Sequence, residues 1–386
     1  MKPRHCDVAV VGLGLMGSAA LHALARRGVD AIGFDPLIVG EARGSSHGSC
    51  RIWRRFNFES PAYTALSDEA FAGWRALEAA SGRTLLRPCP LLEAGPPGSA
   101  IVRQSREVAR AAAQAAGVVG GPTTGAEVNA AWPAFRLPQD WDAVVQESAG
   151  ILLAQTALQA LRDGVADRIV PLAARIEATP AGVRVVTADE DILAGQAIVA
   201  AGPWLGAVVP ALAPLLRVTR QTVGWFRPSR PAAVALGDFP IFLLEGPRAV
   251  IYGFPDFEGR GVKVGQHDHG PTVSPDDWTS APTDAELEPV RASLAAFIPA
   301  AAGPIVEREM CLYTNTLAAD VRPDGGEEFI IDRLPSDPRI IVASPCSGHG
   351  AKFAPAIGEI LASLALDPAF EADRAFRLDR FSAFAR

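Results

Sequence analysis

Apolar and polar positions in the first 35 residues follow the order of a strand, a tight turn, a helix and a second strand. Residues 7–11 are a short apolar run rich in Val, which is typical of a buried strand. The Ala-rich stretch "LMGSAALHALARRG" has the length and apolar content of a helix, and a second apolar stretch ends at Asp35. The pattern predicts a β-α-β unit and, with it, an α/β fold built on a parallel sheet.

Three glycines, Gly12, Gly14 and Gly17, form G-x-G-x-x-G between the first strand and the helix. In this motif the first glycine permits the turn, the second lets backbone N–H groups approach a pyrophosphate, and the third lets the helix lie close to the strand. Asp35 follows the glycine motif at a spacing close to the ~20 residues at which a carboxylate accepts from a ribose hydroxyl. The motif predicts a dinucleotide site but leaves NAD and FAD open, and a glycine-rich turn in another α/β domain is the alternative.

The remaining pattern predicts two interleaved domains. Residues from about 217 to 315 are β-like, with "AVIYGFP" and "GVKVGQHDHG" as the clearest strands, and the last 60 or so residues return to strand, glycine turn and helix. We therefore expect the two ends of the chain to form one nucleotide-binding domain that a β-rich domain interrupts. The predicted boundaries are 1–85, 145–215 and 326–386 for the first domain, and 86–144 and 216–325 for the second.

Composition narrows the class of protein. With 386 residues, 49% hydrophobic and 20% charged, the chain can bury large cores and differs from a disordered protein. The net charge of -7 argues against a nucleic-acid partner, which would need a basic face. No stretch approaches the ~18 uninterrupted apolar residues of a membrane span, so we expect no membrane partner either.

The cysteines indicate a reducing compartment. The chain has five, they are scattered, and none forms a CxxC pair, so neither a disulfide framework nor a metal site is favoured. The start "MKPRHCDVAVVGLGLMG" superficially resembles a secretion signal, but its glycines lie where a strand-to-helix turn needs them. We expect a cytoplasmic protein without a metal.

The stretch "GSSHGSCRIWRR", residues 44–55, places a histidine and three arginines among small residues shortly after the glycine motif. By itself it is compatible with a basic surface turn. Small residues also permit close approach to a ligand, and a guanidinium can bind a carboxylate through two parallel hydrogen bonds.

Four stretches together resemble the monomeric sarcosine oxidase and N-methyltryptophan oxidase family of flavoproteins, within the D-amino-acid-oxidase-like group. They are the Gly12–Asp35 unit, "GSSHGSCRIWRR", "YGFP…VKVGQH" with "CLYTNT", and "CSGHGAKF", and they occur in the family's order over nearly the whole chain. The resemblance implies FAD instead of NAD. It also implies an α/β two-domain flavoprotein fold, in which a Rossmann-like FAD-binding domain is interleaved with a β-rich substrate domain.

The resemblance further implies that FAD is bound covalently through Cys311 of "REMCLYT". Attachment requires a thiolate, which nearby positive charge favours by lowering the thiol pKa. Cys346 is a rival for the link, and a small buried side chain is the alternative for Cys311 itself. The chain departs from the family's pattern after "CLYTNT", where the extra residues "LAADVRPDGG" replace a short turn.

Site roles also follow from the resemblance. His47 and Arg51 are expected against the flavin, and Arg54 is expected to clamp a substrate carboxylate with Lys352 as the second cation. Lys263 matches the lysine used in oxygen activation, with a solvent-facing strand lysine as the alternative. Tyr252 and His267 match pocket-lining residues, although each alone would be an ordinary packed or surface residue. The implied cofactor-binding residues are Gly12, Gly14, Gly17, Asp35, Ser45, Val170, Gly202, Cys311, Gly348, His349, Gly350 and Lys352.

The implied reaction transfers a hydride from the carbon beside a secondary amine to flavin N5. The imine is then hydrolysed in water, and dioxygen is reduced to hydrogen peroxide. The expected partners are a small secondary amine or N-methyl amino acid and O2, and the expected state is a monomer. The alternatives are a flavin dehydrogenase with another electron acceptor, an NAD-linked dehydrogenase, and a binding protein in which the flavin is structural.

Overall fold

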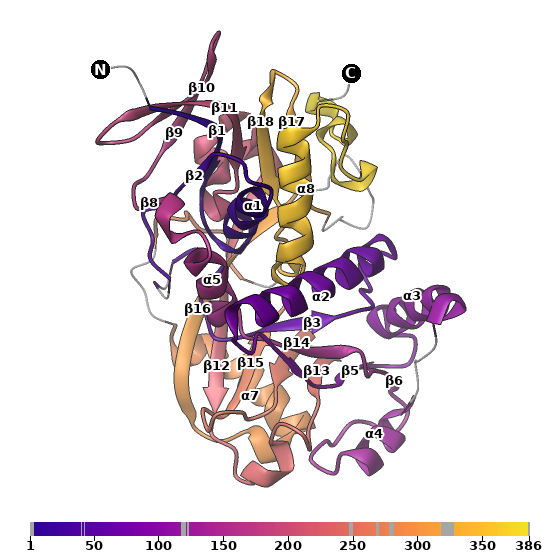
Figure 1. Ribbon diagram of the computed structural model, residues 1–386. Helices are drawn as coiled ribbons and strands as arrows, with labels where there is room; N and C mark the ends of the chain where they lie inside the picture. Colours follow the sequence, from indigo (N-terminus) through magenta and orange to yellow (C-terminus); the bar gives the residue numbers. More distant parts are fainter. Residues whose placement is uncertain are drawn as a thin grey trace.

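A computed structural model describes residues 4–384 except 40, 42, 117–120, 122, 247–249, 268–269, 278–281 and 318–327. The chain forms two regions, each built on its own large sheet, with a small third sheet (Figure 1). Of the extra residues after "CLYTNT", only Leu317 falls within the described part of the chain. Among the helices that the structure describes, none is long and apolar enough to cross a membrane.

The first sheet brings both ends of the chain together. Its strands run in the order β17-β18-β11-β1-β2-β8, and β1 pairs in parallel with both β2 and β11. The strands are β1 (Arg4–Val11), β2 (Ala31–Phe34), β8 (Ile169–Val170), β11 (Asp191–Val199), β17 (Ile330–Leu334) and β18 (Asp337–Ser344). Two more strands, β9 (Arg175–Thr179) and β10 (Gly182–Val186), extend this sheet antiparallel beside β11. The predicted β-α-β unit and parallel sheet are confirmed.

Helices cover the first sheet and pack closely on one another. The glycine turn is followed by α1 (Leu15–Arg26), which lies against α8 (Ala354–Leu366) near the C-terminus. A Cβ at Gly358 of α8 would lie 2.6 Å from the Ala19 carbonyl oxygen, so this contact depends on a glycine. Leu21, Ile198 and Ile357 are fully buried in the core beneath. The helices α2 (Ala62–Ser81) and α5 (Ala154–Asp163) complete this region.

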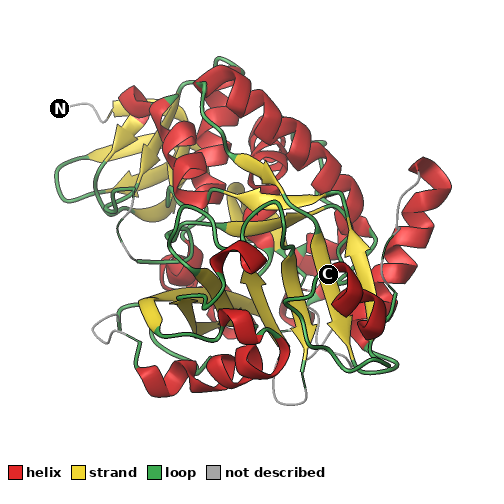
Figure 2. Ribbon diagram, turned by 90° about the horizontal axis from the view of Figure 1, so that it is seen from below, coloured by secondary structure: helices red, strands yellow, loops and turns green. Residues whose placement is uncertain are grey.

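The second sheet supplies the β-rich region, and its strands run in the order β16-β12-β15-β14-β13-β5-β6. They are β5 (Leu91–Gly95), β6 (Asp142–Gln146), β12 (Leu216–Phe226), β13 (Ile241–Glu245), β14 (Val250–Phe254), β15 (Val262–Gln266) and β16 (Ile305–Thr316). The associated helices are α3 (Ala100–Ala116), α4 (Gly125–Ala131) and α7 (Asp284–Phe297). Phe226, Phe242 and Leu287 belong to a separate buried core here. In Figure 2, strands with helices beside them are visible in both regions.

The third sheet joins β3 (Arg51–Arg54), β7 (Ala149–Leu152) and β4 (Leu86–Pro88). From its sequence, the stretch 44–55 was compatible with a surface turn, whereas residues 51–54 form a strand because their backbone pairs with β7. The short elements are α6 (Leu205–Val208), η1 (Ala166–Arg168), η2 (Gly202–Trp204), η3 (Pro210–Leu215), η4 (Pro231–Val234), η5 (Pro299–Ala301), η6 (Gly350–Phe353), η7 (Arg374–Phe376), η8 (Leu378–Arg380) and η9 (Ser382–Phe384). Strands of the two large sheets interleave along the chain, and the domain boundaries themselves remain our proposal.

Candidate active site

A cavity of about 730 Å³, the large cavity, lies at the carboxyl ends of the parallel strands of the first sheet. Its lining includes Val11 at the end of β1, Phe34 at the end of β2 and Ala343 near the end of β18. Open α/β sheets bind ligands at this edge, and pockets of roughly 300–1,000 Å³ suit organic ligands. The large cavity is therefore the candidate cofactor site.

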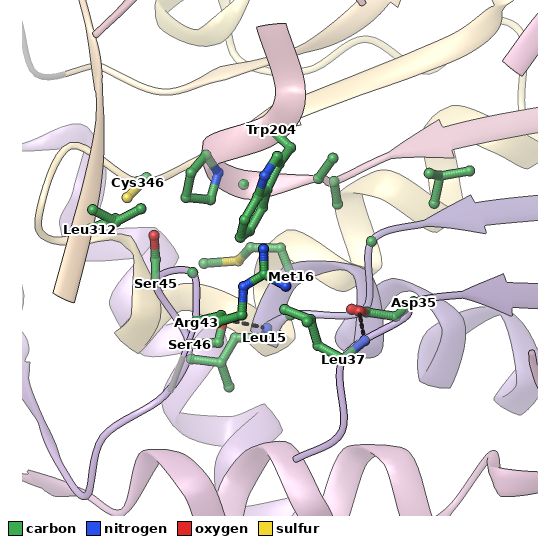
Figure 3. Close-up of a pocket in the computed structure, with 18 of the residues that line it drawn as sticks. Leu15, Met16, Asp35, Leu37, Arg43, Ser45, Ser46, Trp204, Leu312 and Cys346 are labelled. Atoms are coloured by element: carbon green, nitrogen blue, oxygen red, sulfur yellow. Dashed lines mark hydrogen bonds between the residues drawn. The ribbon is translucent and has the colours of Figure 1, made fainter. Parts of the chain in front are cut away.

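The glycine motif has no room for side chains at its turn. Gly12 has φ +89°, and a Cβ there would lie 2.6 Å from the Ala200 carbonyl oxygen. A Cβ at Gly17 would lie 1.8 Å from the Gly12 carbonyl oxygen, so α1 lies directly against the turn. Gly14 precedes α1, and the next N–H, that of Leu15, donates to Ser46 Oγ at 3.0 Å (Figure 3). Gly14, Leu15 and Met16 all line the large cavity, so the start of α1 faces it.

Asp35 lines the same cavity and is held by three donors. Its carboxylate accepts from the Leu13 N–H at 2.6 Å, the Leu37 N–H at 2.8 Å and Arg162 Nη2 at 3.0 Å. Burial raises the pKa of Asp35, while the Leu37 hydrogen bond and Arg162 act in the opposite direction. The sequence analysis missed Arg162, a charged residue on the otherwise apolar buried face of α5. The Val170 carbonyl oxygen accepts from the Asp35 N–H at 3.2 Å, although Val170 is not itself among the residues that line the cavity.

An arginine and a tryptophan that sequence analysis did not single out form another part of the wall. The Arg43 guanidinium lies 5.5 Å from the centre of the Trp204 ring, and Figure 3 shows its side chain directed toward that ring. Trp204 Nε1 donates to Asp276 Oδ1 at 2.8 Å, which fixes the indole. The predicted residue Gly202 lies in the same short helix as Trp204 and lines the cavity.

The predicted residues of the 44–51 segment meet Cys311 at one end of the large cavity. Arg51 Nη2 donates to the carbonyl oxygens of Ser45 at 3.1 Å and His47 at 2.6 Å, and lies 3.6 Å from Cys311 Sγ. His47 Nε2 contacts the Met310 carbonyl oxygen, so the segment is tied to β16. The tertiary structure therefore brings Ser45, His47 and Arg51 together with Cys311, although Cys311 lies about 260 residues further along the chain.

Burial sets the protonation of this end. Burial raises the pKa of the Cys311 thiol, while Arg51 acts to lower it. Burial also lowers the pKa of His47, against an opposing effect of Glu309. At neutral pH the thiol is therefore protonated and the imidazole neutral.

A second cavity of about 90 Å³, the small cavity, adjoins the large one. The two share lining residues, which are Arg51, Cys311, Tyr313, Gly348 and Ala351. Six further predicted site residues line the small cavity: Arg54, Tyr252, Lys263, His267, His349 and Lys352. Gly350 lines only the large cavity. A compartment of substrate size thus opens beside the candidate cofactor site.

Arg54 is surrounded by acidic partners that sequence analysis missed. Its guanidinium donates to Glu93 Oε1 at 2.9 Å, to Glu59 Oε1 and to Asn57 Oδ1 at 3.2 Å. Burial alone would raise the pKa of Glu59. The charges of Arg54 and His349 outweigh this effect and lower that pKa to about 2. Burial raises the pKa of Glu93. The acidic residue within the apolar run "LLEAG" was the one available sequence signal for Glu93.

Lys352 and His349 lie at the same cluster. Lys352 Nζ donates to the His349 carbonyl oxygen at 2.6 Å, and His349 Nδ1 lies 3.8 Å from Glu59 Oε1. The Lys352 carbonyl oxygen accepts from Trp74 Nε1 at 2.8 Å, which anchors this segment to α2. The two cations expected to clamp a carboxylate, Arg54 and Lys352, therefore share the small cavity with Glu59.

Lys263 is only 3% exposed, which excludes the solvent-facing alternative. Its Nζ donates to the Cys50 carbonyl oxygen at 3.4 Å and lies 4.9 Å from the centre of the Trp225 ring. Glu309 Oε2 is 3.9 Å from the same nitrogen.

Tyr252 lies behind these groups and hydrogen-bonds Tyr313, and burial raises the pKa of Tyr252 to about 12. Tyr313, a further residue that sequence analysis missed, lies 6.1 Å ring to ring from His267. Burial also raises the pKa of Tyr313. Both hydroxyls are therefore protonated at neutral pH.

The family pattern described as FAD dependent oxidoreductase matches residues 7–364 of this chain. The chain belongs to the FAD-dependent oxidoreductase family. It is 32% identical to the monomeric sarcosine oxidase of Bacillus sp. (strain B-0618) over 382 residues, which cover 96% of this chain and 94% of that protein. It is also 32% identical to the N-methyl-L-tryptophan oxidase of Yersinia pestis (strain Pestoides F) over 386 residues, covering 97% and 99%.

Solved structures share the fold of this FAD-dependent oxidoreductase. NikD, described as an unusual amino acid oxidase essential for nikkomycin biosynthesis, superimposes with a TM-score of 0.80 at 20% identity, covering 96% of each chain. L-proline dehydrogenase from P. horikoshii superimposes with a TM-score of 0.77 at 18% identity, covering 96% of this chain and 95% of that one.

The predicted resemblance, the two-domain flavoprotein fold and the choice of FAD over NAD are confirmed. The protein is an FAD-dependent oxidoreductase. The large cavity fits this cofactor, because a side-chain-free turn, the start of α1 and the Asp35 carboxylate line it together. Within the described residues, no group of three or more His, Cys, Asp or Glu side chains is placed to hold a metal ion.

Proposed function

We propose that this FAD-dependent oxidoreductase oxidises a small secondary amine or N-methyl amino acid and passes the electrons to dioxygen. The observation that carries the proposal is the buried Lys263 ammonium in a small cavity that shares Arg51 and Cys311 with the cofactor cavity. The names of the relatives, monomeric sarcosine oxidase and N-methyl-L-tryptophan oxidase, support the class of substrate.

When bound, FAD would supply the acceptor for a hydride from the carbon beside the amine and would pass the two electrons to O2, which would be reduced to hydrogen peroxide, while the imine product would be hydrolysed in water. The residues that line the small cavity would hold the substrate and exclude most water from it. Lys263 is buried in the cavity wall and Tyr252 is partly buried there. Nearby cations disfavour a charged ammonium on the substrate, so the amine would be held neutral for oxidation. Lys263 would stabilise the negative charge that forms on dioxygen.

The size and charge of the small cavity restrict the substrate. About 90 Å³ suits a molecule of few heavy atoms. Arg54 and Lys352 supply cations for a carboxylate, but each guanidinium nitrogen of Arg54 already donates to an acceptor of the protein, and Nη2 donates to Glu59. A carboxylated substrate would compete with these acceptors for Arg54, so we include amines without a carboxylate in the expected range.

We further propose covalent attachment of FAD through Cys311. Its Sγ lines the junction of the two cavities, and Arg51 lies 3.6 Å away, where its charge favours a thiolate. Cys346 lines only the large cavity, and its Sγ accepts from the Thr314 N–H at 3.3 Å. The free state of all five cysteines is compatible with a cytoplasmic protein, and we expect a monomer, as the name of one relative states for that protein.

A peroxide assay tests the function. Purified protein should be yellow and should form hydrogen peroxide with one or more of sarcosine, other N-methyl amino acids, proline, pipecolate and small N-methyl amines. The Lys263→Met variant should be reoxidised by O2 at least tenfold more slowly, while its anaerobic reduction by the same substrate is retained. Colourless protein after incubation with FAD, or flavin that no amine reduces, would overturn the proposal.

A flavin dehydrogenase remains the second candidate, because a carboxylate beside Lys263 opposes the charge that oxygen activation needs. It would reduce an artificial electron acceptor under nitrogen and form little peroxide in air.

A further inference from the structure

Glu309 lies among the cations of the small cavity, and the amine oxidation proposed above assigns it no part in holding substrate or cofactor. Its Oε2 is 3.9 Å from Lys263 Nζ, and its Oε1 is 3.9 Å from His47 Nε2. Both Glu309 and Lys263 line the small cavity. One carboxylate therefore contacts both His47, which the family resemblance placed against the flavin, and Lys263, which it assigned to oxygen activation.

The fold holds this carboxylate in place. Glu309 lies on β16 two residues before Cys311, and alternate residues of a strand project from the same face. On its other side lies Gly48, where an added Cβ would be 3.0 Å from both Glu309 oxygens. The absence of a side chain at Gly48 lets the backbone of the 44–50 segment lie directly on the carboxylate. The ion pair is thus enclosed by a strand and a loop.

The enclosure makes the charge of Glu309 effective. The side chains of Lys263 and His47 are 4% and 2% exposed, and that of Glu309 is 21% exposed. Charges a few ångströms apart interact more strongly when water is largely excluded. The negative charge of Glu309 therefore reduces the positive potential that Lys263 presents to the cavity.

Dioxygen responds to that potential. It takes two electrons and one proton from the reduced cofactor and one proton from solvent to become hydrogen peroxide, and the first electron makes it an anion. A fixed positive charge nearby favours this step. We propose that Glu309 attenuates the charge of Lys263 and thereby restrains the use of dioxygen as electron acceptor by this enzyme. The inference rests on the proposed function only for the assignment of Lys263 to the oxygen step.

The experiment compares Glu309→Gln with a matched control, Glu307→Gln. Glu307 lies two residues earlier on the same strand, is 44% exposed and pairs with Arg260 instead of Lys263. The holoenzymes are photoreduced without substrate and mixed with O2, so substrate binding does not enter. We expect reoxidation about tenfold faster in E309Q and unchanged in E307Q, since removing one charge at this distance affects the potential strongly.

Sulfite provides a second readout that needs no turnover. This anion adds to oxidised flavin and bleaches its absorbance, so its dissociation constant reports the local positive potential. We expect sulfite to bind about tenfold more tightly to E309Q than to wild type, whereas Glu309→Asp, which retains the charge, should resemble wild type. Unchanged or slower reoxidation of E309Q, or unchanged sulfite affinity, would overturn the inference.

These results are separable from those of the proposed function. If no amine reduces the wild-type flavin, the proposed function fails, while photoreduction and sulfite titration still test Glu309. If E309Q retains no flavin, Glu309→Ala replaces it in the same two measurements. A loss of sulfite affinity in that variant would also count against the inference.

Discussion

Cys311 illustrates how two opposing effects act on one side chain. Burial favours the neutral thiol, and the Arg51 guanidinium at 3.6 Å favours the thiolate that covalent attachment requires. The same guanidinium donates to Ser45 and His47, so its position does not depend on the thiol. Arg51 thus organises the segment and, in the proposed attachment, would favour the thiolate of Cys311.

We expect Cys311→Ala to abolish the mass increment of FAD on the denatured chain, because the tether would be lost. Cys346→Ala is the matched control and should retain the increment. Intact-protein mass spectrometry of wild type and both variants makes the measurement. An increment that persists in C311A and disappears in C346A would transfer the link to Cys346.

Glu59 makes the free energy of unfolding depend on pH. Its pKa is about 2 in the folded protein against an ordinary value of 4.5, so its contribution is present above about pH 4.5 and is lost as the pH falls toward 2. We expect wild type to lose about 3 kcal/mol of unfolding free energy relative to Glu59→Gln over this interval. Urea unfolding at several pH values measures the difference.

The control for this experiment is Glu288→Gln, which removes an exposed ion pair with Arg291. Exposed pairs contribute about 0–1 kcal/mol, so its unfolding free energy should parallel that of wild type with pH. Parallel curves for wild type and E59Q would contradict the role assigned to Glu59.

At the scale of elements, two contacts of α1 depend on glycines that let backbone segments lie close together: its contact with the turn after β1 and its contact with α8. Gly17 and Gly358 are both helical glycines whose Cβ would enter neighbouring backbone, at 1.8 Å from Gly12 and 2.6 Å from Ala19. The two glycines differ in which contact an added Cβ would disturb. Gly17 supports the cofactor turn, whereas Gly358 supports the contact between α1 and α8.

We therefore expect Gly17→Ala to weaken FAD binding and to lower stability by about 1–3 kcal/mol, the range for overpacking. Gly358→Ala should cost comparable stability while FAD affinity is retained. Thermal unfolding and flavin content of the two variants make the comparison. Equal loss of flavin in both would show that the effect is general destabilisation.

At the scale of the whole molecule, the site assembles from segments far apart in the chain. Residues 44–59 from the N-terminal part, strands β14 to β16 from the middle and residues 345–352 near the end line two adjoining cavities. The first sheet carries the large cavity, and the second sheet supplies Tyr252 and Lys263 to the small one. This arrangement requires both sheets, which agrees with the interleaved order along the chain.

Sequence patterns determined the parts of this protein that depend on near neighbours. The β-α-β unit, the glycine turn and Asp35 were predictable because chain sterics and short spacings govern them. The family resemblance pointed to the cations of the small cavity, but not to Arg43 and Arg162 of the large one. Tertiary structure alone paired Arg54 with Glu59 and Glu93, Asp35 with Arg162, and Lys263 with Glu309. The physical reason is that the strength of a charge pair depends on distance and burial, and packing between remote segments decides both.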